Sequence, residues 1–441
     1  MEPFRIKDYL KTKSIIEWRK RLWKSQYFSS EQLKSLQWEL LSRLLDHCFK
    51  NVPYYHKVYH EHGIVRSDIK SLDDLGRLPL IDKDVLRTSF HQFKADNFNT
   101  YRTIETRTSG STGTPLTLFW ELNANIVALI SMWRQYSWVG YRLGNGFLDI
   151  RSRVWNYPSS YRWTTWCRGL EIPADLIDKA QIHDYADLLR KYRVKLWRGH
   201  APAMHLLASL LKEAGIHDTK PKCITPSGVA VQSYQREFLE DWAGVPVCDA
   251  YDLAERCTTI RQCPEGGYHI SAELGIVEIL KDNCIHAKPG QEGRIIATGL
   301  HNYAFPLIRY DTRDFAIQSD RGCACGRTLP LVESITGRVD DYIINTQGMP
   351  ITGLHFAFYA AKGIKIAQIV QTRLNELDLY VVTTESWNNQ NQSCIIAEIK
   401  KFAGSTMKVI VHKTDKIPYQ QPGKKFKFII CKIESTDRSH Q

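Results

Sequence analysis

One short run of small residues constrains this chain most: Thr108-Ser109-Gly110-Ser111-Thr112-Gly113-Thr114-Pro115 lies between two strand-like stretches, residues 102–106 and 116–120. Glycines let a backbone bend tightly and turn its N–H groups toward an anion, and the hydroxyls add further donors. A run of this composition is often only a flexible linker, but a linker is rarely enclosed by two strands. The run therefore favours a loop that holds phosphate oxygens. It lacks the Gly-Lys-Ser/Thr ending of the P-loop.

The chain before this loop reads as mostly helical over residues 1–100. Residues 31–49 carry leucines at helical spacing, and Asn51-Val52-Pro53 ends that helix because proline cannot continue it. A second, short helix is predicted to begin after Asp82, whose side chain suits an N-cap.

After the loop, strands and helices alternate. Helices are predicted over 182–192 and 202–213, with a strand over 194–197 between them. This alternation favours an α/β architecture with a partly parallel sheet. Strands dominate from 275 to 314, for example over 275–280 and 293–298.

The pattern changes again after Gly337-Arg338, where a small α+β unit begins. We expect a helix near 354–361, a hairpin over 366–384, a polar turn over 388–392, a helix over 393–402 and a final strand pair. The predicted division is therefore a large multi-sheet N-terminal domain, residues 1–339, and a C-terminal domain, residues 340–441. Within the first, the helical start is 1–100 and the remaining 101–339 carries the candidate site.

Composition narrows the class of protein. The 441 residues are 43% hydrophobic and 24% charged, which is typical of a folded chain of two or three domains. No apolar run reaches the length of a bilayer span, and Met1–Lys13 lacks the features of a secretory signal, so we expect a cytoplasmic protein. The formal charge of +12 is dispersed, which favours attraction of anionic substrates such as ATP over specific nucleic-acid binding.

Five segments together resemble the adenylate-forming superfamily, in the order found there. They are the loop at 108–115, Asp249–Glu255, Pro306–Asp314, Ile335–Asp341 and Pro418–Lys424. Within it, the chain is most similar to the branch of phenylacetate–CoA ligases and CapK-like capsule-biosynthesis proteins. The segments that carry this similarity are 44–55, 75–79, 306–310 and 323–327. The resemblance covers essentially the whole chain.

The resemblance implies an activity and its cofactors. A carboxylic acid is activated by Mg²⁺ and ATP to an acyl-adenylate, pyrophosphate leaves, and an acceptor takes the acyl group. The acceptor is the thiol of coenzyme A, a carrier-protein thiol or an amine. The alternative is a non-catalytic protein of the same fold that serves in a polysaccharide or secondary-metabolite pathway. The identity of the acid is not readable from the sequence.

The resemblance also implies roles for individual residues around the nucleotide. Asp314 would accept hydrogen bonds from the ribose hydroxyls, and Arg338 would bind the ribose or a phosphate. The ring of Tyr251 would face the adenine, near Ser227-Gly228. Glu255 would be the Mg²⁺ ligand, since magnesium prefers hard oxygen ligands beside phosphate. Without the resemblance, Asp314 would be a solvated turn acid and Arg338 part of a surface salt bridge. Tyr251 would be a core tyrosine and Glu255 an acid at the start of a helix.

Two more roles fall in the C-terminal part. Lys424, in a Gly-Lys turn before the strand-like stretch 426–430, would stabilise charge on the α-phosphate during adenylation. By composition alone it is a solvated charge like its neighbour Lys425. Asp340 would be the hinge about which the C-terminal domain turns between the two half-reactions.

Four positions depart from the pattern of the superfamily. Asp252 and Arg313 stand where glycine is usual, Ala254 where a hydroxyl residue is usual, and Val229 where the branch often has glutamate. Asp252, Ala254 and Arg313 favour the non-catalytic alternative, whereas the intact phosphate loop and Lys424 oppose it.

The eleven cysteines are an odd number spread over a long chain, which favours reduced thiols over a disulfide framework. Cys263, His269, Cys323 and Cys325 have the donor atoms of a tetrahedral zinc site, with Cys257 as a substitute ligand. Their spacing fits no common zinc signature, and free cysteines are often simply small core residues. Five tryptophans after the loop either line a pocket for the acid or pack the core: Trp133, Trp138, Trp155, Trp163 and Trp166.

Overall fold

The computed structural model describes residues 14–107, 117–151, 160–165, 167–174, 177, 179–228, 231, 233–281, 284–338, 342–346, 350–352, 354, 357, 364–383, 385, 387–418 and 429–433. They form two compact units, one ending at Thr336 and one beginning at Gly337. The predicted boundary residue Asp340 lies outside the described residues.

The helical start consists of α2 (Ser14–Ser25), α3 (Ser30–Asn51), α4 (Pro53–Glu61) and α5 (Lys83–Thr88), with short 3₁₀ turns between them. Ser29 and Gln32 cap α3 reciprocally, and the leucines of α3 are buried. Asp82 caps α5 by accepting hydrogen bonds from the backbone N–H groups of Asp84 and Val85, which confirms the predicted N-cap.

A β-hairpin follows, formed by β1 (Thr103–Arg107) and β2 (Thr117–Glu121), and Arg107 pairs with Thr117 at the end where the connecting run begins and ends. The glycine-rich run therefore connects two paired strands, and itself lies outside the described residues. The next helix, α6 (Leu122–Trp138), is tied to the core by Arg134. Its guanidinium forms a fully buried ion pair with Glu273 at 2.6 Å.

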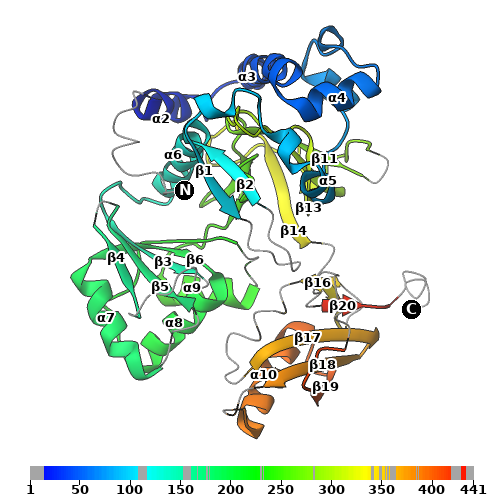
Figure 1. The fold of residues 1–441 in the computed structure, drawn as a ribbon. Helices are drawn as coiled ribbons and strands as arrows, with labels where there is room; N and C mark the ends of the chain where they lie inside the picture. The colour runs from blue at the N-terminus through cyan, green and yellow to red at the C-terminus, as the bar shows by residue number, and fades with distance from the viewer. Residues whose placement is uncertain are drawn as a thin grey trace. The chain divides into compact units, whose positions relative to one another are not determined.

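A five-stranded sheet comes next, with the strand order β4-β5-β3-β6-β7. Its strands are β3 (Gly146–Arg151), β4 (Arg162–Thr164), β5 (Gly169–Pro173), β6 (Val194–Gly199) and β7 (Cys223–Pro226). All neighbours are parallel except the edge strand β4, as the alternating pattern predicts. Helices α7 (Ile182–Lys191), α8 (Ala201–Glu213) and α9 (Ser233–Ala243) cover one face, and α6 packs on the other (Figure 1).

The second large sheet has seven strands in the order β11-β12-β13-β14-β10-β9-β8. They are β8 (Ala250–Asp252), β9 (Thr259–Gln262), β10 (Tyr268–Ile270), β11 (Gly275–Leu280), β12 (Glu292–Gly299), β13 (Tyr310–Gln318) and β14 (Leu331–Arg338). A parallel bridge between Ser227 and Ala250 joins the end of β7 to the start of β8. The two sheets therefore meet at the carboxyl end of β7.

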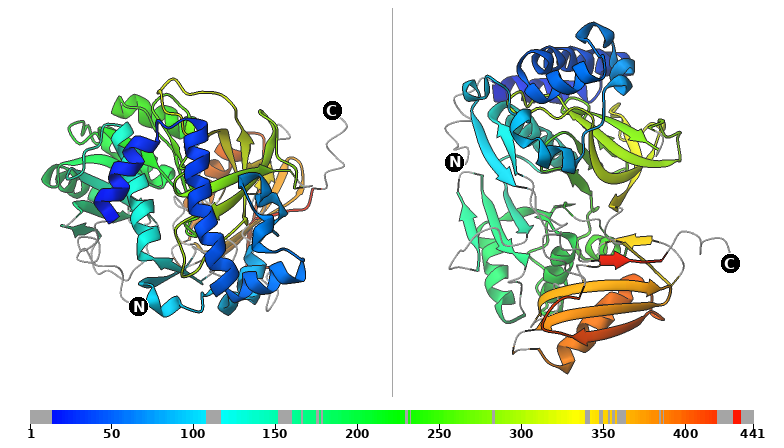
Figure 2. Two further views of the ribbon diagram at one scale, coloured as in Figure 1. Left: turned by 90° about the horizontal axis from the view of Figure 1, so that it is seen from above. Right: turned by 45° about the vertical axis from the view of Figure 1, so that its right-hand side comes forward.

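The C-terminal unit contains a four-stranded sheet in the order β19-β18-β17-β20 and a two-stranded sheet of β15 (Tyr342–Ile344) and β16 (Pro350–Thr352). The predicted hairpin is β17 (Ile364–Arg373) and β18 (Glu376–Thr383). Helix α10 (Asn389–Ala403) packs on one face of the larger sheet (Figure 2). The unit is α+β, as predicted.

Two predictions for this unit were wrong in detail. Residues 388–392 are not a polar turn: Asn388 caps α10, and the following residues form the first turn of that helix. The last strands, β19 (Lys408–Lys413) and β20 (Ile429–Cys431), do not pair with each other but add in parallel to β18 and β17. The helix predicted for 354–361 falls largely outside the described residues.

Across the part of the chain that the structure describes, no helix is long and apolar enough to cross a membrane.

Candidate functional site

Tyr251 and Asp314 are brought together from different strands. Tyr251 lies on β8 and Asp314 on β13, and the phenolic hydroxyl of Tyr251 donates a hydrogen bond to Oδ2 of Asp314 at 2.7 Å. Asp314 is buried, and its backbone N–H donates to Oγ1 of Thr312. Burial, followed by the charge of Asp314, raises the pKa of the Tyr251 phenol well above its usual value. The phenol therefore stays protonated and orients the carboxylate.

Ser227 and Gly228 lie beside this pair. The Ser227 N–H donates to the carbonyl oxygen of Gly199 at 2.7 Å, and Ser227 bridges Ala250, the residue before Tyr251. Gly228 has φ +80°, in the left-handed region that favours glycine, and a Cβ there would lie 3.5 Å from the ring of His200. Ligands of α/β sheets bind at the carboxyl ends of parallel strands. These residues stand at the end of β7, the position that rule predicts.

Glu255 lies in the turn after β8 and is 7% exposed. It is not at the start of a helix. The hydroxyl of Tyr310, the first residue of β13, donates to Oε1 of Glu255 at 2.8 Å. A carboxylate oxygen that accepts a hydrogen bond still has lone pairs for a cation, so the residues present are compatible with a Mg²⁺ ion that arrives with ATP. Tyr310 lies in one of the five matched segments, but nothing in the sequence predicts its contact with Glu255.

Trp120 fixes the same turn from the other side. Its indole N–H donates to the carbonyl oxygen of Ala254 at 2.7 Å, and the guanidinium of Arg256 lies over its ring, 4.1 Å from the centroid. Trp120 is on β2, the strand that leaves the glycine-rich run. The turn that carries Glu255 is therefore attached to the hairpin that carries the predicted phosphate loop. Sequence patterns gave no signal for this link.

Two of the departures have structural partners. Asp252 accepts a hydrogen bond from Nη2 of Arg261 at 2.5 Å; Arg261 is 2% exposed and also donates to Gln135. A buried guanidinium needs such a partner, because an unpaired buried charge is strongly destabilising. Asp252 therefore pairs with the buried charge of Arg261.

Arg313 adopts φ +61°, in the left-handed region that favours glycine. Its guanidinium bonds Asp82 at 3.2 Å and Asp84 at 2.7 Å, which links β13 to α5. The hydrogen bond from Arg313 lowers the pKa of Asp84.

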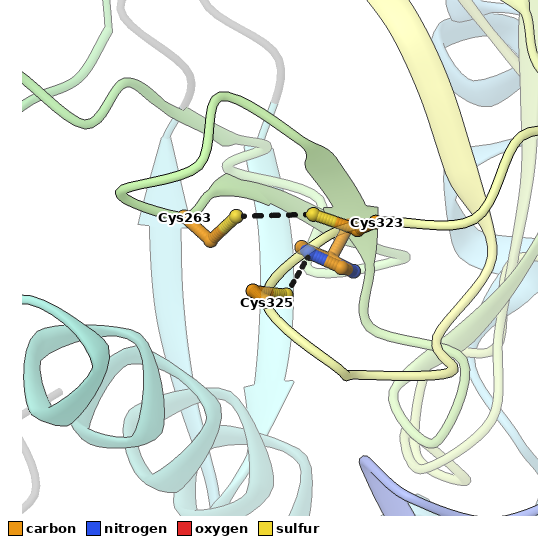
Figure 3. A group of neighbouring side chains, drawn as sticks. Cys263, Cys323 and Cys325 are labelled. Atoms are coloured by element: carbon orange, nitrogen blue, oxygen red, sulfur yellow. Dashed lines mark hydrogen bonds between the residues drawn. The ribbon is translucent and has the colours of Figure 1, made fainter.

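The four predicted zinc ligands also meet. The ligand atoms of Cys263, His269, Cys323 and Cys325 all lie within 4.8 Å of one another. The two sulfur atoms of Cys263 and Cys323 are 3.5 Å apart, and Sγ of Cys325 is 3.2 Å from Nε2 of His269. Figure 3 shows the side chains of Cys323 and Cys325, from the loop before β14, beside that of Cys263, from the loop after β9.

The spacing in this cluster suits a tetrahedral ion. With bonds of about 2.3 Å to sulfur and 2.0 Å to nitrogen, neighbouring ligand atoms on zinc lie roughly 3.3–3.8 Å apart. The sulfur–sulfur distance of 3.5 Å is too long for a disulfide bond. Gly267 permits this approach, since a Cβ there would lie 2.7 Å from Sγ of Cys323. Burial lowers the pKa of His269 to about 4, so its imidazole is neutral, as a metal ligand must be.

Cys257 does not join this cluster. It is 1% exposed in the hydrophobic core, and its thiol points to the backbone oxygen of Glu255 at 3.7 Å. Cys257 is therefore a small core residue close to Gly275 and Gly299, and not a substitute ligand of the cluster.

The described tryptophans do not share one pocket. Trp138 packs edge-on against His269 at 5.5 Å, and Trp163 stacks on Tyr192 at 3.8 Å, beside α7. Trp133 packs among the apolar side chains of α6 and the five-stranded sheet. Trp155 and Trp166 are outside the described residues.

Several predicted site residues cannot be placed. The loop residues Thr108 to Thr114, Val229, the hinge residue Asp340 and Lys424 lie outside the described residues. Arg338 is the last residue of β14, and only its backbone is described.

Comparisons with known proteins find similar sequences over most of this chain. A family model described as the CapK C-terminal domain matches residues 343–432. A phenylacetate-coenzyme A ligase of Thermus thermophilus is 24% identical over 335 residues, which cover 71% of this chain and 72% of the relative. One from Pseudomonas putida is 26% identical over 334 residues, which cover 72% and 73%.

Solved structures show the same fold. A 2-hydroxyisobutyryl-CoA ligase in the postadenylation state matches with a TM-score of 0.64 at 19% identity, over 92% of this chain and 90% of that chain. The same ligase in the thioesterification state, with an acyl-AMP and CoA, matches with a TM-score of 0.60 at 20% identity, over 92% and 91%.

Proposed function

Because this chain belongs to the adenylate-forming superfamily, in its branch of phenylacetate–CoA ligases and CapK-like proteins, we propose that it joins a small carboxylic acid to coenzyme A at the expense of ATP. The hydrogen-bonded pair of Tyr251 and Asp314 carries this proposal. It supplies an aromatic face and an oriented carboxylate at the end of β7, which suit an adenine and a ribose.

The reaction proceeds in two steps. A carboxylate oxygen of the acid attacks the α-phosphorus of ATP, and the bond to the bridging oxygen breaks with its electron pair on pyrophosphate. The thiolate of coenzyme A then attacks the acyl carbon, and AMP leaves. The first step asks the protein mainly to position the reactants and to stabilise charge.

The residues of this chain divide that work. Asp314 accepts hydrogen bonds from the ribose hydroxyls, and Tyr251 holds the carboxylate of Asp314 in place. Ser227 and Gly228 bring backbone atoms close to the adenine. The run from Thr108 to Thr114 binds the leaving pyrophosphate, and Arg338 contacts the ribose or a phosphate. Lys424 stabilises charge on the α-phosphate.

Two metals belong to the proposal. Glu255, held by Tyr310, would bind the Mg²⁺ that accompanies ATP, and this ion neutralises phosphate charge. Zinc would be held by Cys263, His269, Cys323 and Cys325, where it would fasten the loop after β9 to the loop before β14. The zinc is structural in this proposal and takes no part in the reaction.

A thiol of coenzyme A is the acceptor we propose; a carrier-protein thiol or an amine remains an outcome to test in the second step. The non-catalytic alternative rests on Asp252, Ala254 and Arg313. It loses support from the structural partners of Asp252 and Arg313, because these residues stabilise neighbouring segments. Ala254 still favours it, since alanine brings no hydroxyl to the phosphates.

Calorimetric titration with nucleotides tests the proposal. We expect the protein to bind MgATP and AMP, and to bind the corresponding guanosine nucleotides more weakly. A protein that binds none of these nucleotides would contradict the proposed function.

A further inference from the structure

Gln262 stands between the four-ligand cluster and the proposed nucleotide site. It is the last residue of β9, directly before the ligand Cys263, and it is 8% exposed. Its side-chain amide forms hydrogen bonds on both sides. Nε2 donates to the carbonyl oxygen of Gly266 at 3.2 Å, and Oε1 accepts from the backbone N–H of Asp249 at 3.0 Å. Because an amide has its donor and its acceptor at different atoms, Gln262 bridges these two groups in one orientation only.

On one side of this bridge, Gly266 belongs to the turn that joins two ligands of the cluster. Cys263 and His269 flank the turn. The N–H of Cys263 donates to the carbonyl oxygen of Gly267, and the N–H of Gly266 donates to that of Cys263, both at 2.9 Å. A metal ion bound by Cys263 and His269 would fix both ends of the turn. It would thereby fix the carbonyl group to which Gln262 donates.

On the other side, Asp249 leads directly into β8. The backbone N–H of Gln262 donates to the carbonyl oxygen of Asp249 at 2.9 Å, so Gln262 holds both backbone groups of that residue. The next residue, Ala250, forms the bridge to Ser227, and Tyr251 of the proposed nucleotide site follows. The position of Asp249 therefore determines where β8 enters the site.

Further contacts strengthen the side of the bridge that faces β8. Nη2 of Arg236, on α9, donates to the same Oε1 of Gln262 at 3.1 Å. The hydroxyl of Tyr268 donates to Oδ2 of Asp249 at 3.4 Å. Oε1 of Gln262 thus accepts two hydrogen bonds, and Nε2 donates one. A carboxylate at this position would keep the two acceptor bonds and lose only the bond to Gly266.

We infer that zinc at the cluster raises the affinity of the nucleotide site, and that Gln262 is the positioning residue that connects the two. This inference rests on the proposed function and adds regulation of the same site. The zinc takes no part in the chemistry. It holds the turn after β9, and Gln262 transmits that position to β8, where Tyr251 and Asp314 bind the nucleotide. Coupling between two binding sites is reciprocal, so AMP raises the affinity for zinc by the same factor.

Calorimetric titration of zinc-loaded and zinc-depleted wild-type protein with AMP tests the inference. We expect the zinc-depleted protein to bind AMP about fivefold to tenfold more weakly, which is in the lower part of the usual range for coupled sites. Competition with a chromogenic zinc chelator should show that AMP raises the affinity for zinc by about the same factor. Circular dichroism, well below the unfolding temperature, checks that both forms are folded.

Gln262→Glu isolates the connection from the metal itself. The variant keeps all four zinc ligands and both acceptor bonds of residue 262, but it has no donor for Gly266. Zinc-loaded Gln262→Glu should therefore bind AMP about fivefold more weakly than wild type, and zinc removal should change its affinity by less than about twofold. Gln318→Glu is the matched control. Its amide also donates to a backbone carbonyl oxygen at 3.2 Å, that of Ser319, and the variant should behave as wild type does with and without zinc.

The outcomes separate this inference from the proposed function. An affinity for AMP that does not change when wild-type protein loses zinc, or a full zinc effect in Gln262→Glu, would overturn the inference and leave the proposed function standing. Protein that binds no zinc would do the same. Wild-type protein that binds no AMP in either form would defeat the proposed function.

Two substitutes cover a loss of folding. If zinc-depleted protein does not fold, zinc-loaded Gln262→Glu is compared with zinc-loaded wild type, and equal affinities for AMP would overturn the inference. If Gln262→Glu does not fold, Gln262→Asn replaces it, because the shorter amide cannot span both bonds.

Discussion

The hydroxyl of Tyr251 donates to Oδ2 of Asp314 at 2.7 Å, across two strands of the seven-stranded sheet that are not neighbours. In the proposed function, this bond would orient the carboxylate that accepts hydrogen bonds from the ribose, and it would hold the ring of Tyr251 beside the adenine. The pair is therefore the part of the site on which nucleotide affinity should depend most.

Asp314→Asn should weaken AMP binding by about tenfold or more, because a neutral amide is a poorer acceptor than a carboxylate. Tyr251→Phe keeps the ring and should lose less. Calorimetric titration with AMP measures both. Asp218→Asn, which changes an exposed carboxylate paired with Arg190, serves as the control. Wild-type affinity in Asp314→Asn would remove Asp314 from the site.

Purified protein should contain about one zinc per chain, bound at the four-ligand cluster. Cys323→Ser should lose the metal and unfold at a lower temperature, as measured by elemental analysis and thermal denaturation. Cys257→Ser should keep its zinc, because Cys257 lies in the core, and so should Cys284→Ser at an exposed position. Metal-free protein with unchanged thermal stability would count against a structural zinc.

The stability of the N-terminal unit should fall in mild acid through His301. Its ring is 3% exposed, Nε2 bonds the carbonyl oxygen of Glu273 at 2.7 Å, and burial lowers its pKa to about 4. Since the unfolded histidine has a pKa of about 6.5, the unfolded chain binds the extra proton between these values, and stability is lost as the pH falls from about 6.5 toward 4. The slope should approach about 1.4 kcal/mol per pH unit.

Urea unfolding at a series of pH values measures this slope. His301→Gln keeps an N–H donor but cannot titrate, so its stability should vary less with pH than that of wild type. His286→Gln changes an exposed histidine and should leave the slope unaltered. An identical slope in wild type and His301→Gln would show that another group is responsible.

Asp340→Pro tests the proposed hinge. Proline fixes φ, so the variant should keep acid-dependent pyrophosphate exchange but lose transfer of the acyl group to coenzyme A, if the backbone at Asp340 must rotate between the steps. Both half-reactions are to be measured separately on folded protein. An equal loss in both would indicate a static boundary.

Much of the fold was predictable because local patterns determine it. The leucine spacing of α3, the N-cap Asp82 and the strand–helix alternation around β6 each follow from a short-range rule. The ends of the C-terminal elements were less predictable, since the cap of α10 by Asn388 and the parallel addition of β19 and β20 depend on side-chain and long-range pairing.

The candidate site was likewise predictable only in part. Tyr251, Asp314 and the four zinc ligands could be nominated from matched segments or residue type. The partners that hold the site in place, such as Tyr310 for Glu255 and Trp120 for Ala254, lie 55 and 134 positions away in the chain. Such contacts leave no periodic or compositional signal. The roles of Asp252 and Arg313 were equally hidden, because their partners Arg261 and Asp84 are found only in the folded chain.

The most direct test of the account is acid-dependent exchange of labelled pyrophosphate into ATP, screened over a panel of carboxylic acids. Wild-type protein should catalyse exchange with at least one acid. Lys424→Ala should reduce that rate by orders of magnitude with MgATP binding retained, while the neighbouring Lys425→Ala should stay close to wild type. No exchange with any acid, from protein that binds MgATP, would contradict the ligase function and favour the non-catalytic alternative.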